Sequence, residues 1–258
     1  METCRGHSIL STENTSRNTY DHGRWEGRRR FLRFLLRYVG FTLLVKLDRV
    51  EGLENIPDQG PAILLINHIA FVDPIVALHI IPRNIIPLAK IEVYDYPVIG
   101  VLPRLWGVIP VRREEVDRRA IQQALQVLRA GEIILVAPEG TRGPQLQRGK
   151  EGMAYLASRS GAPIIPVAID GTEGFPSPRF SRRWQEPGVV IKFGKPFYYQ
   201  TDLRNAGREY LRQMADDAMY VLAGMLPSER RGVYQDLSLA ELTTIQGSME
   251  SQLDKQST

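Results

Sequence analysis

Two short segments of this 258-residue sequence carry side chains that could do chemistry. In the first, His68 follows an apolar run, and Asp73 precedes Pro74 as at a helix start. The turn between them can bring the Asp73 carboxylate to Nδ1 of His68, which fixes the imidazole tautomer and leaves Nε2 free as a general base. This is the histidine–carboxylate half of a Ser-His-Asp triad, with the hydroxyl supplied by the substrate. Helix capping by Asp73 and simple packing of His68 would account for the same residues.

The second segment is a glycine-rich loop that runs from Pro138 to Arg142 and continues to Lys150. Glycine lets the backbone approach an anion closely, and Arg142 offers a planar, permanently charged fork for a phosphate. The spacing of a Walker loop is missing, so the segment predicts a site for a phosphate monoester rather than for a nucleoside triphosphate. A polar turn with a solvated arginine is the alternative interpretation.

Taken together, the two segments closely resemble the signature of the glycerolipid acyltransferase family, whose best-known members are the 1-acyl-sn-glycerol-3-phosphate acyltransferases. That family has four sequence blocks, and all four occur here in order. They are His68 with Asp73, Lys90–Arg113, Pro138–Arg142 and Ile164–Val167. The resemblance covers about residues 30 to 197 of the chain.

The resemblance implies an O-acyltransferase that moves an acyl chain from an acyl thioester to the free hydroxyl of a lysophospholipid. The donor would be acyl-CoA or acyl-carrier protein. The acceptor would be lysophosphatidic acid, which becomes phosphatidic acid in phospholipid biosynthesis. His68 would be the base and Asp73 its orienting partner. Because a thiolate of modest basicity leaves, we expect no metal and no cofactor.

The same resemblance implies a group of side chains that bind the acceptor phosphate. Lys90 and Arg142 would contact the phosphate, Glu139 would orient them, and Gly140 would allow close approach. The full candidate set is Lys90, Arg112, Arg113, Glu139, Gly140, Thr141 and Arg142. Backbone N–H groups near Asn67 or Gly140 are candidates to stabilise the oxyanion.

Other functions stay open from the sequence. The acceptor could be glycerol 3-phosphate, a lyso-ornithine lipid or another lysophospholipid, and a non-catalytic membrane-binding protein could share the fold. The 33 basic and 29 acidic side chains leave a formal charge of +4, and a pI near 9.2 could indicate nucleic-acid binding. The arginines, however, gather among Phe and Leu and no nucleic-acid-binding motif occurs, so we expect no nucleic-acid partner.

Short apolar runs rich in Ile and Val alternate with helical patterns between residues 48 and 235, which we expect to form the acyltransferase domain. The patterns of residues 114–130 and 202–225 predict helices. The runs predict buried strands at Ala62–Ile66, Ile85–Leu88, Val108–Val111, Ile133–Ala137, Ile164–Ile169 and Val189–Phe193. The sequence therefore predicts a single α/β domain with a mostly parallel central sheet flanked by helices, and with its chemistry in the loops beyond the strand ends.

Residues 24–47 predict a basic amphipathic helix. Its longest uncharged run, Tyr38–Val45, is far shorter than the roughly 18–20 apolar residues that span a bilayer. We therefore expect it to lie in the membrane interface, with its arginines on anionic headgroups. The membrane-binding candidates are Arg28, Arg29, Arg30, Phe31, Arg33, Phe34 and Arg37. A core-packing first helix with a solvated basic edge is the alternative.

The ends of the chain and its single cysteine complete the sequence prediction. Residues 1–23 predict a disordered leader, and residues 236–258 predict a polar, partly disordered tail with a short helix around Ser238–Ile245. Cys4 cannot form an internal disulfide, which favours a reducing compartment, and four histidines leave little material for a zinc site. We expect a peripheral or monotopic protein on the cytoplasmic side of the cell membrane.

Overall fold

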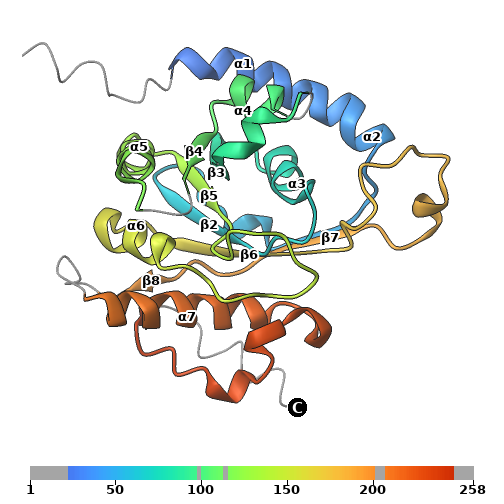
Figure 1. The fold of residues 1–258 in the computed structure, drawn as a ribbon. Helices are drawn as coiled ribbons and strands as arrows, with labels where there is room; N and C mark the ends of the chain where they lie inside the picture. The colour runs from blue at the N-terminus through green and yellow to red at the C-terminus, as the bar shows by residue number, and fades with distance from the viewer. Residues whose placement is uncertain (1–22, 98–99, 113–115, 201–206, 247–258) are drawn as a thin grey trace, which may run out of the picture.

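A seven-stranded sheet with helices on both faces forms the centre of the molecule (Figure 1). The computed structural model describes residues 23–97, 100–112, 116–200 and 207–246. The strand order is β1-β7-β6-β2-β5-β3-β4. The strands are β1 (Leu47–Glu51), β2 (Ala62–Ile66), β3 (Ile85–Lys90), β4 (Ile109–Val111), β5 (Ile133–Val136), β6 (Ile164–Asp170) and β7 (Val189–Phe193).

The predicted α/β class is confirmed, because the sheet is mostly parallel. Strands β6, β2, β5, β3 and β4 pair in parallel, whereas β7 is antiparallel to β6, and β1 pairs in parallel with β7. All six apolar runs form strands. The prediction missed β1, whose sequence LDRVE is largely exposed. As an edge strand it has no need of the continuous apolar run that identified the others.

The sheet separates two apolar cores. In β2, Ile63 and Leu65 pack into the core shared with α5 (Arg118–Arg129), α6 (Gly152–Ser160) and α7 (Arg208–Gly224). Ala62, Leu64 and Ile66 pack into the core on the other face, which α3 (Asp73–Ile80), α4 (Val101–Trp106) and the N-terminal helix cover. This alternation follows from the two-residue period of a strand. Because both faces are covered, every residue of β2 is buried.

The helices α5 and α7 begin at Arg118 and Arg208. The helix expected at residue 114 begins at Arg118, because the Asp117 side chain accepts a hydrogen bond from the Ala120 N–H at 3.0 Å and caps the helix. Glu114 and Glu115 lie outside the described residues. The predicted end at Gly131 is confirmed by its left-handed φ of 78°. Of the helix expected at 202–225, residues 208–224 form α7, and residues 202–206 also lie outside the described part.

The N-terminal helix is present but differs in detail from the prediction. It comprises α1 (Gly23–Leu35), a π-helical turn (Leu36–Gly40) and α2 (Phe41–Leu43). It ends before residue 47, because Leu47 already belongs to β1. In the part of the chain that the structure describes, no helix combines the length and the apolar character needed to cross a bilayer.

Two arginines assigned to membrane binding point inward instead. Arg29 is 0% exposed, and its Nε donates a hydrogen bond to the carbonyl of Trp106 at 2.7 Å. Arg33 is half-buried and donates to Oδ1 of Asn84 at 2.9 Å. The expectation was wrong for Arg29 and only partly right for Arg33, because both side chains fasten α1 to the domain. Arg28, Arg30 and Arg37 are exposed as expected.

The helix expected around Ser238–Ile245 does not form. The chain makes a 3₁₀ turn at Leu237–Leu239, and β9 (Ile245–Gln246) pairs with β8 (Tyr198–Tyr199). Thr244 donates both its N–H and its hydroxyl to Asp217 of α7, at 3.0 and 2.7 Å. This buried pairing orders residues up to 246. Residues 1–22 and 247–258 lie outside the described part.

Gly107 makes the packing of α1 on α4 possible. It caps the C-terminal end of α4 with a φ of 75°, and a Cβ there would lie 2.7 Å from the Trp25 ring and 3.1 Å from Nη2 of Arg29. We expect Gly107→Ala to lower the free energy of unfolding by about 2 to 4 kcal/mol, from the left-handed backbone and the overpacking. Urea unfolding measures this change.

Gly27→Ala is the matched control within α1. A Cβ at Gly27 meets nothing within 4 Å, so the better helix propensity of alanine should raise the free energy of unfolding by up to about 1 kcal/mol. Equal free energies of unfolding for the two variants would contradict the close packing of α1 on α4 at Gly107.

Candidate active site

The candidate residues meet at the carboxyl-terminal edge of the parallel strands. β2 ends at Ile66 and leads into His68, and β5 ends at Val136 and leads into Glu139. Since β2 and β5 are parallel neighbours, their outgoing loops emerge side by side. The Gly143 N–H donates to the carbonyl of His68 at 2.9 Å, which joins the loops directly. The two segments singled out in the sequence therefore form one site.

His68 and Asp73 form the expected pair. Nδ1 of His68 lies 2.9 Å from Oδ2 of Asp73, whose side chain is fully buried, whereas the His68 side chain is 19% exposed. An ionised carboxylate can only accept hydrogen bonds, so the imidazole hydrogen lies on Nδ1 and Nε2 is the free base. The arrangement can remove a proton from a group that approaches His68 from the open side.

Asp73 has a different structural role from the cap that the sequence suggested. It is the first residue of α3, but its Oδ2 accepts the N–H groups of Ile69 and Ala70, at 2.6 and 2.8 Å, from the preceding turn. Its side chain caps no helical N–H. The carboxylate instead folds the turn back onto itself, which fixes the position of His68 before any substrate binds.

Glu139 connects the two loops. Its Oε1 accepts the N–H of His68 at 3.1 Å, and its Oε2 accepts the N–H of Gln147 at 2.8 Å. Burial raises the pKa of Glu139 to about 7, although the two N–H groups favour its ionised form. The role assigned from the sequence was wrong in this respect, because the contacts of Glu139 are with backbone N–H groups and not with Lys90 or Arg142.

Asn67 fixes the end of β2 against β6. Its side-chain amide donates to the carbonyl of Ile169 at 2.7 Å and accepts the Ile169 N–H at 2.8 Å. This reciprocal pair continues the ladder of a strand beyond the last residue of β2. These two hydrogen bonds fix the position of Asn67, the residue directly before His68.

An apolar cavity opens beside His68. It has a volume of about 150 Å³ and lies between the sheet and the helices α1, α3 and α4. Its lining includes Leu32, Leu36, Ile66, Phe71, Ile75, Leu78, Leu88, Ala89, Leu102, Trp106, Leu135 and Ala137, with His68 as the ionisable member. A hydrocarbon chain in this cavity would end next to the imidazole.

The remaining phosphate-binding candidates lie around the same edge. Gly140 has a φ of 72°, a left-handed conformation that favours glycine, and Thr141 and Arg142 after it are exposed. Lys90 ends β3 and pairs with Glu92 at 2.8 Å. Arg112 follows β4, and its N–H donates to Asp117 at 3.0 Å. Arg113 lies outside the described residues.

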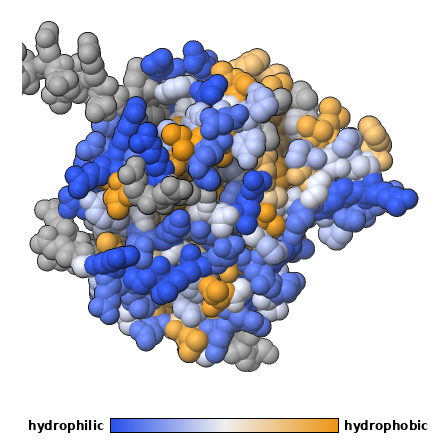
Figure 2. All heavy atoms as spheres, in the orientation of Figure 1, coloured by the Kyte–Doolittle hydropathy of each residue, from blue (hydrophilic) through white to orange (hydrophobic). Residues whose placement is uncertain are grey.

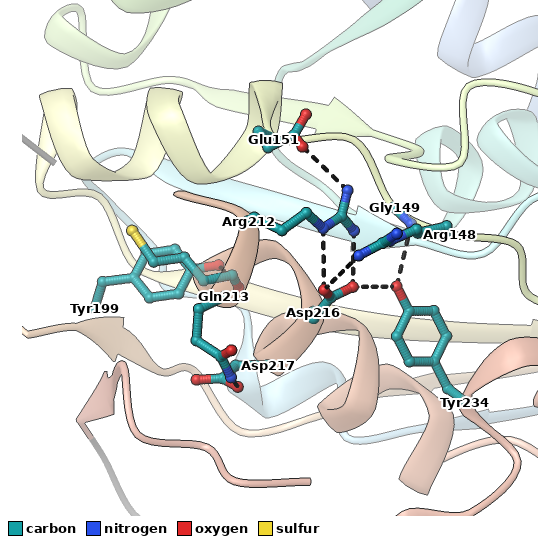
Figure 3. Close-up of polar contacts among 10 residues, drawn as sticks. Arg148, Gly149, Glu151, Tyr199, Arg212, Gln213, Asp216, Asp217 and Tyr234 are labelled. Atoms are coloured by element: carbon teal, nitrogen blue, oxygen red, sulfur yellow. Dashed lines mark hydrogen bonds and ion pairs between the residues drawn. The ribbon is translucent and has the colours of Figure 1, made fainter. Parts of the chain in front are cut away.

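A polar cluster on α7 holds the far end of the glycine-rich loop (Figure 3). Tyr234 accepts the N–H of Gly149 at 3.2 Å and donates its hydroxyl to Asp216 at 2.8 Å. Arg212 donates two hydrogen bonds to Asp216 and a third to Glu151. Burial opposes ionisation of Asp216, but the hydrogen bonds from Arg212 and Tyr234 outweigh it and lower the pKa. The glycine-rich loop is therefore held by Glu139 near its start and by Tyr234 near its end.

Several residues that build this site were not predicted from the sequence. Gln147, Gly143 and Gly149 act through backbone N–H groups, which leave no signal in side-chain type. Tyr234 and Asp216 lie far along the chain from the loop that they support. Asn67 was named only for nearby backbone N–H groups, and the pairing of its side chain with Ile169 was not predicted. Among the described residues, no group of three or more His, Cys, Asp or Glu side chains could hold a metal ion.

Comparison with known proteins shows what this part of the chain resembles. A family model described as Acyltransferase matches residues 48–170, which include both loops. This part of the chain is therefore similar to the acyltransferase family. The structure supports the similarity, because the His68–Asp73 pair and the Pro138–Arg142 loop, distant in sequence, share one edge of the sheet.

Individual relatives cover part of the chain. The 1-acyl-sn-glycerol-3-phosphate acyltransferase of Borreliella burgdorferi is 33% identical over 130 residues, which are 49% of this chain and 52% of that protein. The enzyme of the same name from Bacillus subtilis is 30% identical over 124 residues, or 48% of this chain and 62% of that one. The chain thus spans about half the length of the curated relatives that it matches.

A solved structure extends the likeness to the fold. The 1-acyl-sn-glycerophosphate (LPA) acyltransferase PlsC from Thermotoga maritima is 27% identical to this chain, with a TM-score of 0.54. The match covers 74% of this chain and 78% of that one. The likeness to the fold of that enzyme therefore extends beyond the two loops to most of this chain.

The raised pKa of Glu139 predicts a pH dependence of stability. Because its folded-state pKa of about 7 lies above the usual 4.5, the stabilisation from this group is present below pH 4.5 and is lost as the pH rises to about 7. Relative to Glu139→Gln, the free energy of unfolding of the wild type should fall by about 3 kcal/mol over this range. Urea unfolding of both proteins at several pH values measures the difference.

Glu209→Gln serves as the control. Glu209 is exposed in the first turn of α7, so this variant and the wild type should show the same pH dependence. Parallel curves for the wild type and Glu139→Gln would show that burial does not raise the pKa of Glu139.

Proposed function

We propose that this protein transfers an acyl chain from an acyl thioester to the free hydroxyl of a lysophospholipid, and that lysophosphatidic acid is the acceptor. The observation that carries the proposal is the 2.9 Å contact between His68 and Asp73 at the mouth of an apolar cavity. The names of the relatives from Borreliella burgdorferi, Bacillus subtilis and Thermotoga maritima support the same reaction.

His68 performs the proton transfers. Nε2 removes the proton of the acceptor hydroxyl while the oxygen attacks the thioester carbonyl carbon, and the new C–O bond forms. Asp73 stabilises the resulting imidazolium through Nδ1. The tetrahedral intermediate then collapses, the C–S bond breaks, and the thiolate takes the proton back from His68. No redox change occurs, and the acyl group passes unchanged from sulfur to oxygen.

The donor is an acyl thioester, either acyl-CoA or acyl-carrier protein. A thiol has a pKa of about 8.5, so its thiolate leaves readily and the reaction requires neither metal nor cofactor. The cavity beside His68 accepts the acyl chain, because its walls are apolar and it ends at the imidazole. This position brings the carbonyl carbon of the thioester close to Nε2.

Basic side chains around the loop bind the acceptor phosphate. The Gly143 N–H donates to the carbonyl of His68, and Arg142 directly precedes Gly143. The Arg142 side chain therefore leaves the backbone close to His68, where the hydroxyl would react. Lys90 and Arg112 approach the same edge from β3 and β4. Gly140 and Thr141 contribute backbone close to the phosphate, and Glu139 holds the loop in place.

The N-terminal helices place the protein on an anionic membrane surface. Hydrophobic side chains gather along the upper edge of the molecule, where α1, α2 and α4 lie (Figure 2). Phe31 is 65% and Phe34 59% exposed, and Arg28, Arg30 and Arg37 are exposed beside them. Aromatic and basic side chains on one helix favour the interface of a bilayer. The lipid acceptor and product would remain within reach, on the cytoplasmic side.

The catalytic pair is tested by His68→Ala. Transfer from labelled acyl-CoA to lysophosphatidic acid should fall about a thousandfold or more, because the variant lacks the imidazole that accepts the hydroxyl proton. Thermal unfolding and vesicle binding should stay close to the wild type, since His68 lies at a cavity mouth. Turnover like that of the wild type would contradict this mechanism.

The membrane surface is tested by a double variant, Phe31→Ser with Phe34→Ser. Its affinity for vesicles that contain phosphatidylglycerol should fall by about tenfold or more, since each phenylalanine contributes about 1.5–3 kcal/mol when buried. Val233→Ser is the control, because Val233 is also 65% exposed but follows α7 on the other side of the sheet. An equal loss in both variants would rule out a surface specific to α1.

A further inference from the structure

A second cavity lies on the opposite face of the sheet from the one beside His68. It has a volume of about 270 Å³ and lies between α5, α6 and the ends of β3, β4 and β5. Its walls are mostly apolar. They include Val111, Ala120, Ile121, Val136, Met153 and Leu156. In the proposed reaction, the acyl donor occupies the other cavity, beside His68.

The two cavities meet at the edge of the sheet. Leu88, Ala89 and Ala137 line both of them, so the ends of β3 and β5 form a common wall. The loop after this wall carries Glu139, which binds the N–H of His68. A molecule in either cavity would therefore extend toward the same catalytic edge.

The mouth of the second cavity carries polar and charged groups. Gly140, Arg112, Asp117 and Lys150 contribute to its lining. The Lys150 side chain lies against Gly140, where a Cβ would be 3.3 Å from both Cε and Nζ. The ammonium group thus stands beside the glycine of the candidate phosphate loop. An apolar interior with cations at its mouth is complementary to a hydrocarbon chain that ends in an anionic head.

We propose that this cavity binds the hydrocarbon chain of the acyl acceptor, and that Lys150 binds the acceptor phosphate at its mouth. The inference rests on the proposed function, because the product of that reaction carries two chains on neighbouring glycerol oxygens. One chain comes from the donor and one is already on the acceptor. Two cavities on opposite faces keep these chains apart and bring their polar ends together at His68.

Gly152 offers a direct test of the cavity. It is the first residue of α6 and lines the cavity, and a Cβ there meets nothing within 4 Å. Gly152→Phe adds a bulky side chain to the lining of the cavity at a position where its Cβ meets no other atom. We expect the KM for palmitoyl lysophosphatidic acid to rise about tenfold relative to the KM for the hexanoyl form, as for the loss of about two buried methylenes.

Gly224→Phe is the matched control. Gly224 ends α7, and a Cβ there also meets nothing within 4 Å, but this residue lines neither cavity. Its KM ratio for the two acceptors should equal that of the wild type. An unchanged ratio in Gly152→Phe would overturn the assignment and leave the acceptor chain in the membrane. A change in donor chain-length preference instead would assign the cavity to the donor and would also overturn it.

Lys150→Gln tests the mouth. The KM for lysophosphatidic acid should rise about tenfold, whereas the KM for the uncharged monoacylglycerol, as a poor acceptor, should change much less. Equal effects on both acceptors would remove Lys150 from the phosphate site. Lys195→Gln controls for the general loss of positive charge, because Lys195 follows β7 and lines neither cavity.

Binding without donor separates this inference from the proposed function. Palmitoyl lysophosphatidic acid is titrated into wild type and Gly152→Phe by calorimetry. Binding that weakens in the variant supports the cavity even if the wild type transfers no acyl chain, in which case the proposed function alone falls. Transfer by the wild type with equal binding by both proteins would overturn the cavity alone.

Discussion

The arrangement of the site depends on one buried carboxylate. Glu139 accepts an N–H from each of two strand-end loops, and its burial keeps water away from both hydrogen bonds. Together with the hydrogen bond from the Gly143 N–H to the His68 carbonyl, this bridge fixes His68 to the glycine-rich loop. The candidate phosphate-binding groups and His68 belong to different loops, so their relative position is set by contacts between the loops and not by either loop alone. The raised pKa of Glu139 is the electrostatic consequence of this position.

The sheet acts as a partition as well as a scaffold. Alternate residues of β2 face two cores, and each core leaves a cavity where its helices diverge from the strand ends. Polar groups gather at the edge between the cavities, because parallel strands send their outgoing loops to the same side. Apolar chains and a charged headgroup can thus be accommodated without burying an unpaired charge.

Sequence patterns predicted the parts of this structure that depend on side-chain type. Runs of Ile and Val predicted six strands, and the spacing of His68 and Asp73 predicted that their side chains pair. The patterns failed where a role depends on tertiary contacts. Arg29 has the same type as its exposed neighbours, but its burial follows from the Trp106 carbonyl on α4. β1 was missed because an edge strand needs few apolar residues. Glu139 was expected to bind cations, whereas its partners are backbone N–H groups that side-chain composition does not show.

The N-terminal helix links the proposed membrane surface to the cavity beside His68. Phe31 and Phe34 point outward, whereas Leu32 and Leu36 line the cavity beside His68. Arg29 and Arg33 hold the same helix against α4 and Asn84. The proposed membrane surface and the wall of the cavity are therefore opposite faces of the same helix. Since the helix forms this wall, a shift of the helix at the proposed surface would change the shape of the cavity.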